Sequence, residues 1–173
     1  ETDKGISFYK RALEVDPLSM PALEALERIY DERGNHQDLV EILSRKVQAL
    51  EDSDRIAQHK LRMGGLYESS LNDLNKAGRQ YREVMELDGG NLLAMRGLER
   101  IYEATQNWNE LVDVLERQLD VVETERERVS VLLKLALIQE EQFLKADVAA
   151  QRLEQALEID PADARAYIAL ERC

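Results

Sequence analysis

The sequence predicts an all-α fold in which about ten helices form antiparallel pairs. Three observations predict it. The composition favours helices, because Leu, Ala, Glu and Arg are abundant while Pro and Gly account for only 3 and 8 residues. Apolar residues recur every third or fourth position, as they do on one face of a helix. The chain also repeats itself at a long, regular interval, which indicates a fold built from copies of one unit.

The repeat is visible directly in the sequence. LERIY occurs at 26–30 and at 98–102, and LER occurs again at 170–172. We call the distance from Leu26 to Leu98 the repeat interval. Around these words, EVDPLSMPALEALERIY (14–30) and ELDGGNLLAMRGLERIY (86–102) are identical at 8 of 17 positions.

Each copy of the repeat divides again into two halves. Tyr30, Tyr67 and Tyr102 mark equivalent positions in three successive halves. Each half is typical of two amphipathic helices joined by a short polar turn. The whole chain is therefore expected to consist of helix pairs.

The helices of the first copy follow in order. Helix 2–15 ends before Pro17, because a residue that precedes proline disfavours the α conformation. Helix 19–33 carries an apolar stripe through Leu23 and Leu26, and Gly34 suits the left-handed conformation that ends it. Helix 36–50 carries a second apolar stripe. Helices 54–70 and 74–87 complete the unit, and the glycines of LDGGN end the latter.

The second copy predicts the remaining helices. Helices 91–105, 108–122 and 125–142 follow 19–33, 36–50 and 54–70 by the repeat interval or nearly so, while 145–159 ends before Pro161 and 162–173 begins a further copy. We therefore expect one repeat array, 1–173, without an internal linker. It consists of a second helix at 2–15, helix pairs at 19–50, 54–87, 91–122 and 125–159, and a first helix at 162–173. Because the sequence begins without Met, we expect it to be a fragment of a longer protein.

The pattern resembles the tetratricopeptide repeat. LRMGGLY (61–67) supplies an apolar residue, a small residue and a tyrosine in a first helix, and AGRQYREVMELD (77–88) supplies Ala77 and Tyr81 in the second helix. AAQRLEQALEIDP (149–161) adds the closing Ala-Leu and proline. Glu27 and Glu99 differ, since they occupy a position where the family prefers a small residue. The resemblance covers essentially the whole chain and implies a right-handed α-solenoid, a TPR-like superhelix whose first helices line a concave groove.

No catalytic, cofactor or metal site is predicted. The chain has no HExxH, CxxC, GxSxG, GxGxxG or phosphate-binding loop motif, and His36 and His59 lie far apart in sequence. Cys173 is the only cysteine, so no disulfide can form within the chain, and a reducing compartment such as the cytoplasm is permitted. Trp108 admits two interpretations, a stacking platform for a ligand or a packing residue, and packing is favoured.

The net charge of −12 makes binding to nucleic acid or to anionic membranes unfavourable. No apolar segment reaches the roughly 18 residues that would span a bilayer. Both observations favour a protein as the binding partner.

The cationic residues of the first helices give the main functional prediction. Arg28, Arg100 and Arg172 share one repeat position opposite the apolar stripe. Four further cations are expected to face the groove implied by the resemblance: Arg62, Arg96, Lys134 and Arg165. A basic strip on an acidic chain predicts preference for an acidic or carboxylate-ended peptide. Alternatively, Arg28 pairs with Glu24 and Glu32 of its own helix, which adds roughly a few tenths of a kcal/mol.

These observations predict a non-enzymatic scaffold that presents a groove to a peptide or to a segment of a partner protein. The alternative is that the chain is the non-catalytic repeat arm of a larger enzyme or signalling protein whose active domain lies elsewhere. We expect the helices 2–15 and 162–173 each to lack a neighbour on one apolar face, which predicts end-to-end self-association.

Overall fold

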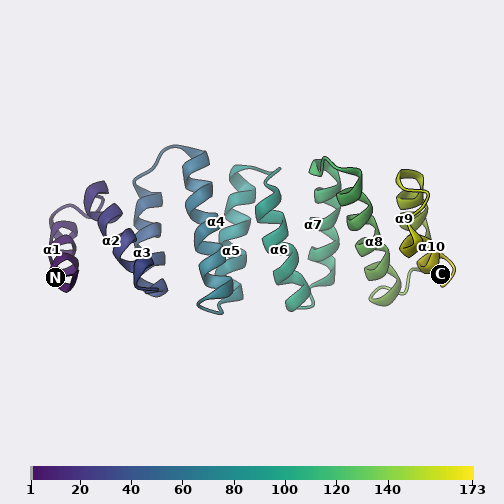
Figure 1. The fold of residues 1–173 in the computed structure, drawn as a ribbon, viewed down its shortest axis with the longest axis horizontal. Helices are drawn as coiled ribbons and strands as arrows, with labels where there is room; N and C mark the ends of the chain where they lie inside the picture. The colour runs from purple at the N-terminus through teal and green to yellow at the C-terminus, as the bar shows by residue number, and fades with distance from the viewer. Residues whose placement is uncertain (1) are drawn as a thin grey trace. The chain divides into compact units, whose positions relative to one another are not determined.

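The computed structural model describes residues 2–173, which form ten α-helices without a strand (Figure 1). The first five helices are α1 (Thr2–Val15), α2 (Met20–Glu32), α3 (His36–Gln48), α4 (Ser53–Ser69) and α5 (Leu74–Leu87). The others are α6 (Leu92–Ala104), α7 (Trp108–Val121), α8 (Glu125–Glu141), α9 (Ala146–Ile159) and α10 (Ala164–Leu170). The all-α class and the order of the helices are therefore confirmed. We call α2, α4, α6, α8 and α10 the first helices and the other five the second helices.

The chain forms two compact units that meet between Gly97 and Leu98, within α6. The first unit contains α1 to α5 and the beginning of α6, and the second contains the rest of α6 and α7 to α10. Neighbouring helices within each unit pack against one another, α1 on α2, α2 on α3 and α3 on α4 in the first, and α7 on α8 and α8 on α9 in the second. The expected single array over residues 1–173 stays a prediction.

The apolar stripes predicted from the sequence form the core of the first unit. Leu23 and Leu26 of α2 and Leu39 and Leu43 of α3 have no exposed surface. In a close-packed interior, each leucine is held by many dispersion contacts in addition to the hydrophobic effect. The core of the second unit includes Leu132 of α8 and, from α9, Leu153 and two alanines, Ala149 and Ala156.

Tyr81 of α5 explains two small residues on first helices. A Cβ atom added to Gly64 of α4 would lie 2.5 Å from the tyrosine ring, and one added to Gly97 of α6 would also lie 2.5 Å from it. The hydroxyl of Tyr81 donates a hydrogen bond to Glu68 at 2.8 Å. The ring therefore occupies space that only glycine leaves open on both sides.

Four turns between helices use a residue with a left-handed backbone. Gly34 has φ 64°, as its sequence position predicts, and its equivalent in the next copy of the repeat, Gln106, has φ 56°. The second equivalent pair consists of Asn72 (φ 52°) and Leu144 (φ 54°). The backbone geometry is thus repeated although glycine occurs at only one of the four positions, because the packing of the helix pairs fixes the turn.

The last helix is shorter than predicted. The expected range was 162–173, but α10 begins at Ala164 and ends at Leu170. Its start is fixed by Asp163, whose carboxylate accepts hydrogen bonds from the backbone N–H groups of Arg165 and Ala166. Since an N-cap residue is itself outside the helical conformation, residues 162 and 163 cannot belong to the helix.

Both terminal helices expose large apolar side chains. Phe8 of α1 is 68% exposed, and Tyr167 and Ile168 of α10 are 50% and 70% exposed. These side chains provide the apolar surfaces on which the expected end-to-end association depends, and the association itself stays a prediction.

Candidate interaction surface

Arg62 links two first helices of the first unit. From α4 it forms ion pairs with two carboxylates of α2, through one guanidinium nitrogen to Glu27 and through the other to Asp31 at 2.9 Å. Such fork-shaped contacts fix the guanidinium more firmly than a single ion pair does. Arg62 therefore connects α4 to α2 and its charge is compensated within the chain, while its place in a groove stays a prediction.

Glu27 also holds a lysine of the intervening second helix. Lys46 of α3 donates to the second oxygen of Glu27 at 2.6 Å. The side chain of Lys46 is 8% exposed and that of Glu27 is 16% exposed, so both charges have lost most of their hydration. A buried ion pair is maintained only when its partners satisfy each other. We call Glu27, Asp31, Lys46 and Arg62 the Glu27 cluster.

The same arrangement recurs in the second unit, at the equivalent positions of the next copy. Glu99 of α6 accepts from Gln118 of α7 at 2.6 Å and from Lys134 of α8 at 2.5 Å. Lys134 also pairs with Glu103 at 2.7 Å. We call Glu99, Glu103, Gln118 and Lys134 the Glu99 cluster. Its buried partner on the second helix is a neutral glutamine, which is 3% exposed, in place of Lys46.

The glutamates at the centre of both clusters are the residues that differ from the family pattern. A small residue at this position would let the helices pack without polar contact, whereas Glu27 and Glu99 each connect three helices through hydrogen bonds. The difference from the family pattern identified the two positions, but it did not predict which residues the two glutamates contact. Each glutamate lies 19 residues before its partner on the second helix, Lys46 or Gln118, and 35 residues before its partner on the next first helix, Arg62 or Lys134. This repeated spacing is the sequence signal that could have identified the partners.

Electrostatics within the Glu99 cluster favour the charged form of its lysine. Burial lowers the pKa of Lys134, but the hydrogen bonds with Glu103 and Glu99 raise it, and the net pKa lies above the ordinary 10.5. The two carboxylates therefore bind the ammonium group more strongly than water solvates it. Consequently, Lys134 is not an unpaired cation for an acidic ligand.

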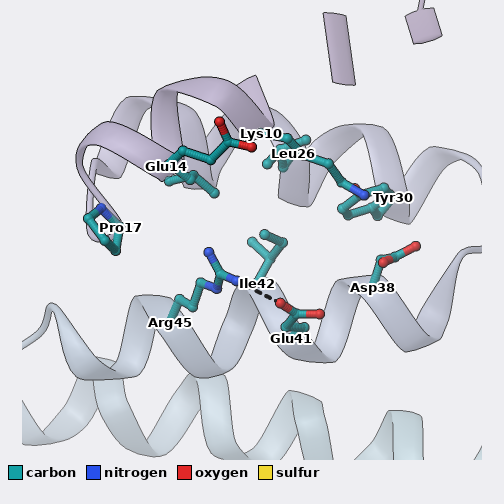
Figure 2. Close-up of a pocket in the computed structure, with 10 residues that line it drawn as sticks. Lys10, Glu14, Pro17, Leu26, Tyr30, Asp38, Glu41, Ile42 and Arg45 are labelled. Carbon is teal, nitrogen blue, oxygen red and sulfur yellow. Dashed lines mark hydrogen bonds and ion pairs between the residues drawn. The ribbon is translucent and has the colours of Figure 1, made fainter. Parts of the chain in front are cut away.

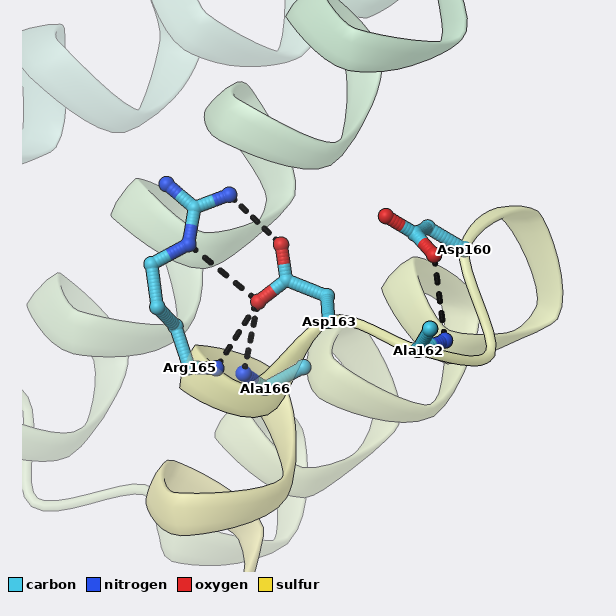
Figure 3. Close-up of polar contacts among 5 residues, drawn as sticks. All are labelled: Asp160, Ala162, Asp163, Arg165 and Ala166. Carbon is cyan, nitrogen blue, oxygen red and sulfur yellow. Dashed lines mark hydrogen bonds and ion pairs between the residues drawn. The ribbon is translucent and has the colours of Figure 1, made fainter.

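Two predicted groove residues near the C-terminus are also paired with carboxylates. Arg165 donates to Asp163 from Nε at 3.2 Å and from Nη2 at 2.5 Å, while the same carboxylate caps α10 (Figure 3). These hydrogen bonds from Arg165 and from the backbone lower the pKa of Asp163 in spite of its burial. Arg172 forms a two-pronged pair with Glu140 of α8, at 2.9 and 2.7 Å.

The remaining three cations are exposed. Within residues 2–173, Arg28 makes no hydrogen bond or ion pair, so the alternative pairing with Glu24 and Glu32 does not occur in this structure. Arg96 and Arg100 each interact with another group of the chain. Arg28 is thus the predicted groove residue whose charge is least compensated. Whether all seven cations form one continuous strip stays a prediction.

The described part of the chain holds no cluster of three or more His, Cys, Asp or Glu side chains arranged for a metal ion. Cys173 is exposed and unpaired with another cysteine. Trp108 is the first residue of α7 and is half-buried. None of the helices from Thr2 onward is both long and apolar enough to cross a membrane.

Comparison with known proteins identifies the repeat. A tetratricopeptide repeat model matches residues 22–56, which include most of α2 and all of α3, and residues 94–129, which include most of α6 and all of α7. No curated protein sequence matches the chain. Several solved structures are similar in fold.

The crystal structure of MamA protein has 18% sequence identity and a TM-score of 0.59, over 92% of this chain and 83% of that chain. YrrB, described as a TPR protein with an unusual peptide-binding site, has 15% identity and a TM-score of 0.58, over 98% and 83%. The N-terminal domain of stress-induced protein-1 (STI-1) from C. elegans has 16% identity and a TM-score of 0.59, over 70% and 98%.

Identities this low establish similarity of fold alone. Proteins of this repeat fold generally mediate protein–protein interactions and are typically non-catalytic. The sequence of the chain therefore matches the tetratricopeptide repeat in two segments, 22–56 and 94–129, and its fold is similar to solved structures over most of its length.

Proposed function

We propose that this chain is a protein-interaction scaffold that binds a segment of a partner protein along its first helices. The observation that carries the proposal is that ion pairs connect neighbouring first helices in each unit. Arg62 joins α4 to α2 in the first unit, and Lys134 joins α8 to α6 in the second. Side chains from successive helices thus belong to one surface within each unit, and an extended segment can contact several repeats.

The ion pairs also narrow the expected chemistry of the partner. An acidic ligand at Arg62 or Lys134 would have to compete with two carboxylates of the chain itself. Arg28 makes no such contact and is exposed. We therefore assign an acidic residue of the partner to Arg28 and expect the rest of the segment to bind through neutral polar and apolar contacts.

The test is a selection of peptides from a displayed library of random 12-residue sequences, followed by affinity measurement on the chain. Peptides that bind the first helices should slow hydrogen exchange in α2 and α4, and those with an acidic residue should weaken about tenfold with Arg28→Glu. Arg11→Glu is the matched control, because Arg11 is exposed on a second helix and the chain itself has Glu83 at the equivalent position. The proposal is wrong if no peptide is enriched, or if the peptides protect only second helices.

A further inference from the structure

A groove opens between α1 and α3, two second helices that both pack on α2. Its volume is about 580 Å³. Figure 2 shows Lys10 and Glu14 of α1, with Leu26 and Tyr30 of α2 beside them, on one side, and Glu41 and Arg45 of α3 on the opposite side. The groove belongs entirely to the first unit and lies apart from the Glu27 cluster, which faces α4.

The floor of the groove is apolar. It consists mainly of Leu13 of α1, Leu26 and Tyr30 of α2 and Ile42 of α3, each at most 5% exposed. The Tyr30 hydroxyl is buried and has no hydrogen-bond partner of normal geometry. The ammonium of Lys10 lies 5.9 Å from the centre of the tyrosine ring. An apolar side chain that entered the groove would contact hydrocarbon on three helices.

The rim of the groove is charged and carries an excess of carboxylates. The five charged residues that line it are Lys10, Glu14, Asp38, Glu41 and Arg45, with a net charge of −1. Arg45 is compensated by Glu41 at 2.8 Å, and Asp38 accepts from the amide of Asn35. Tyr30, Asp38 and Glu41 all raise the pKa of Lys10, with Tyr30 the largest cause. Among the described residues, Glu14 has no hydrogen-bond or ion-pair partner, so its charge is available to a ligand.

The internal repeat retains these charges more faithfully than it retains other surface charges. Each of the five charged lining residues has an equivalent of the same sign in the next copy, for example Arg82 for Lys10, Glu86 for Glu14 and Arg117 for Arg45. Some exposed charges elsewhere change sign, as Arg11 does to Glu83 and Glu24 does to Arg96, while others, such as Arg28 and its equivalent Arg100, keep it. Helix propensity alone does not distinguish the two sets, because Glu, Lys and Arg are all good helix formers.

The space between two second helices of the second unit, α7 and α9, has a different character. It is crossed by an ion pair between Arg152 and Glu116, at 2.6 Å. Its lining is polar except for Leu119. A hydrophobic anchor would find little apolar surface there, whereas the groove between α1 and α3 has an open entrance above an apolar floor.

We propose that the groove between α1 and α3 is a second docking site, for a partner-protein segment that carries an apolar side chain next to a lysine or arginine. The apolar side chain packs against Leu13 and Ile42, and the cation pairs with Glu14. The charge argument excludes an acidic segment, because the rim is net negative in a chain of charge −12. This inference rests on the proposed scaffold function and assigns it a surface separate from the first helices.

The experiment uses the same displayed library of random 12-residue peptides, selected in parallel on the wild-type chain and on Glu14→Lys. Peptides enriched on the wild type should pair a Leu, Ile, Met or Phe with a nearby Lys or Arg, and should slow hydrogen exchange in α1 and α3. For one such peptide, replacement of its basic residue by Glu, or of its apolar residue by Ser, should raise the Kd at least tenfold. The Glu14→Lys chain should reverse the preference and bind the Glu-containing peptide more tightly.

Glu24→Arg is the matched control, since Glu24 is an exposed carboxylate outside the groove and its repeat equivalent is already arginine. It should leave the Kd within twofold. The proposal is overturned if the basic and acidic peptides bind the wild type equally well, or if Glu14→Lys does not alter their order. If the enriched peptides bind more weakly to Arg28→Glu but equally well to Glu14→Lys, the scaffold function stands and docking in this groove is excluded. If no peptide is enriched, both proposals are excluded.

Discussion

Replacement of Glu27 by glutamine should destabilise the protein far more than the same change at Glu99, although the two residues are equivalent in the repeat. Glu27→Gln removes the negative charge beside Lys46, which is 8% exposed and has no other carboxylate partner among the described residues. Loss of one partner of a buried ion pair costs about 3 to 5 kcal/mol, because the other charge remains desolvated and uncompensated. The amide oxygen of the new glutamine still accepts from Lys46, so we expect about 3 kcal/mol.

Glu99→Gln leaves no buried charge unpaired. The buried partner of Glu99 is the neutral Gln118, and Lys134 is 35% exposed and keeps its 2.7 Å pair with Glu103. The loss is then that of a partly exposed ion pair, about 1 kcal/mol or less. The structure therefore predicts a difference of roughly 2 kcal/mol between two chemically identical substitutions.

The assay is equilibrium unfolding in urea followed by circular dichroism, together with native-state hydrogen exchange. Stacked repeats can unfold segment by segment, so amides of α2 and α6 report on the two clusters separately. Lys46→Gln copies the arrangement of the second unit and should cost less than about 1 kcal/mol, since Glu27 keeps its ion pair with Arg62 and no buried charge is left unpaired. In the Lys46→Gln background, Glu27→Gln should cost no more than Glu99→Gln does. Equal losses for Glu27→Gln and Glu99→Gln in the wild-type background would refute the reasoning.

Three further predictions concern packing, turns and acid stability. Gly64→Ala should destabilise by about 1 to 3 kcal/mol because its Cβ meets the Tyr81 ring, whereas Gly65→Ala, whose Cβ meets nothing within 4 Å, should stabilise by about 0.5 to 1 kcal/mol in urea unfolding. Gln106→Gly should raise the free energy of unfolding by up to about 1 kcal/mol, since a side chain at φ 56° is strained, and a lower stability would show that the glutamine side chain contributes contacts. Burial raises the pKa of Glu83, but hydrogen bonds from Lys60 and Arg79 bring it below the ordinary 4.5. The contribution of ionised Glu83 to the free energy of unfolding is thus fully present above pH 4.5 and is lost as the pH falls through the lowered pKa. Glu83→Gln should therefore make the free energy of unfolding fall less steeply with decreasing pH in this range.

The helices were predictable because each depends on local information. Apolar spacing, prolines and the internal repeat determined every helix boundary to within three residues. The largest error is at the end of α10, which was predicted to reach 173 and ends at Leu170. The start of α10 was predicted two residues too early, because the capping role of Asp163 was not considered. The turns show the limit of local information in another way. The left-handed backbone at Gly34 was predictable because glycine favours that conformation. The same backbone at Gln106 and Leu144 was not predictable from residue type, since the helices on either side impose it.

Side-chain partners were not predictable in the same way, because they depend on which helices become neighbours. Arg62 and Lys134 were expected to face a groove, which stays a prediction, and in the structure they form ion pairs with carboxylates of α2 and α6. Their availability to a ligand was not a property of their own helices. It was decided by Glu27 and Glu99, which stand 35 residues earlier in the chain. A search for charges one helical turn away could find only partners on the same helix.

The same physical reasoning separates a charge that contributes to folding from one that can serve binding. A cation enclosed by two carboxylates, such as Lys134, already stabilises the fold through its ion pairs. A ligand carboxylate that bound Lys134 would gain only the difference between its own ion pair and the ion pairs that it replaced. Arg28 on a first helix and Glu14 on a second helix have no ion pair to exchange in the part of the chain that the structure describes. A ligand group at either position competes only with water. The two residues differ in sign and occupy different surfaces, so a partner that bound both would need an acidic and a basic-apolar segment. Reversal of each charge separately should then weaken one segment without affecting the other.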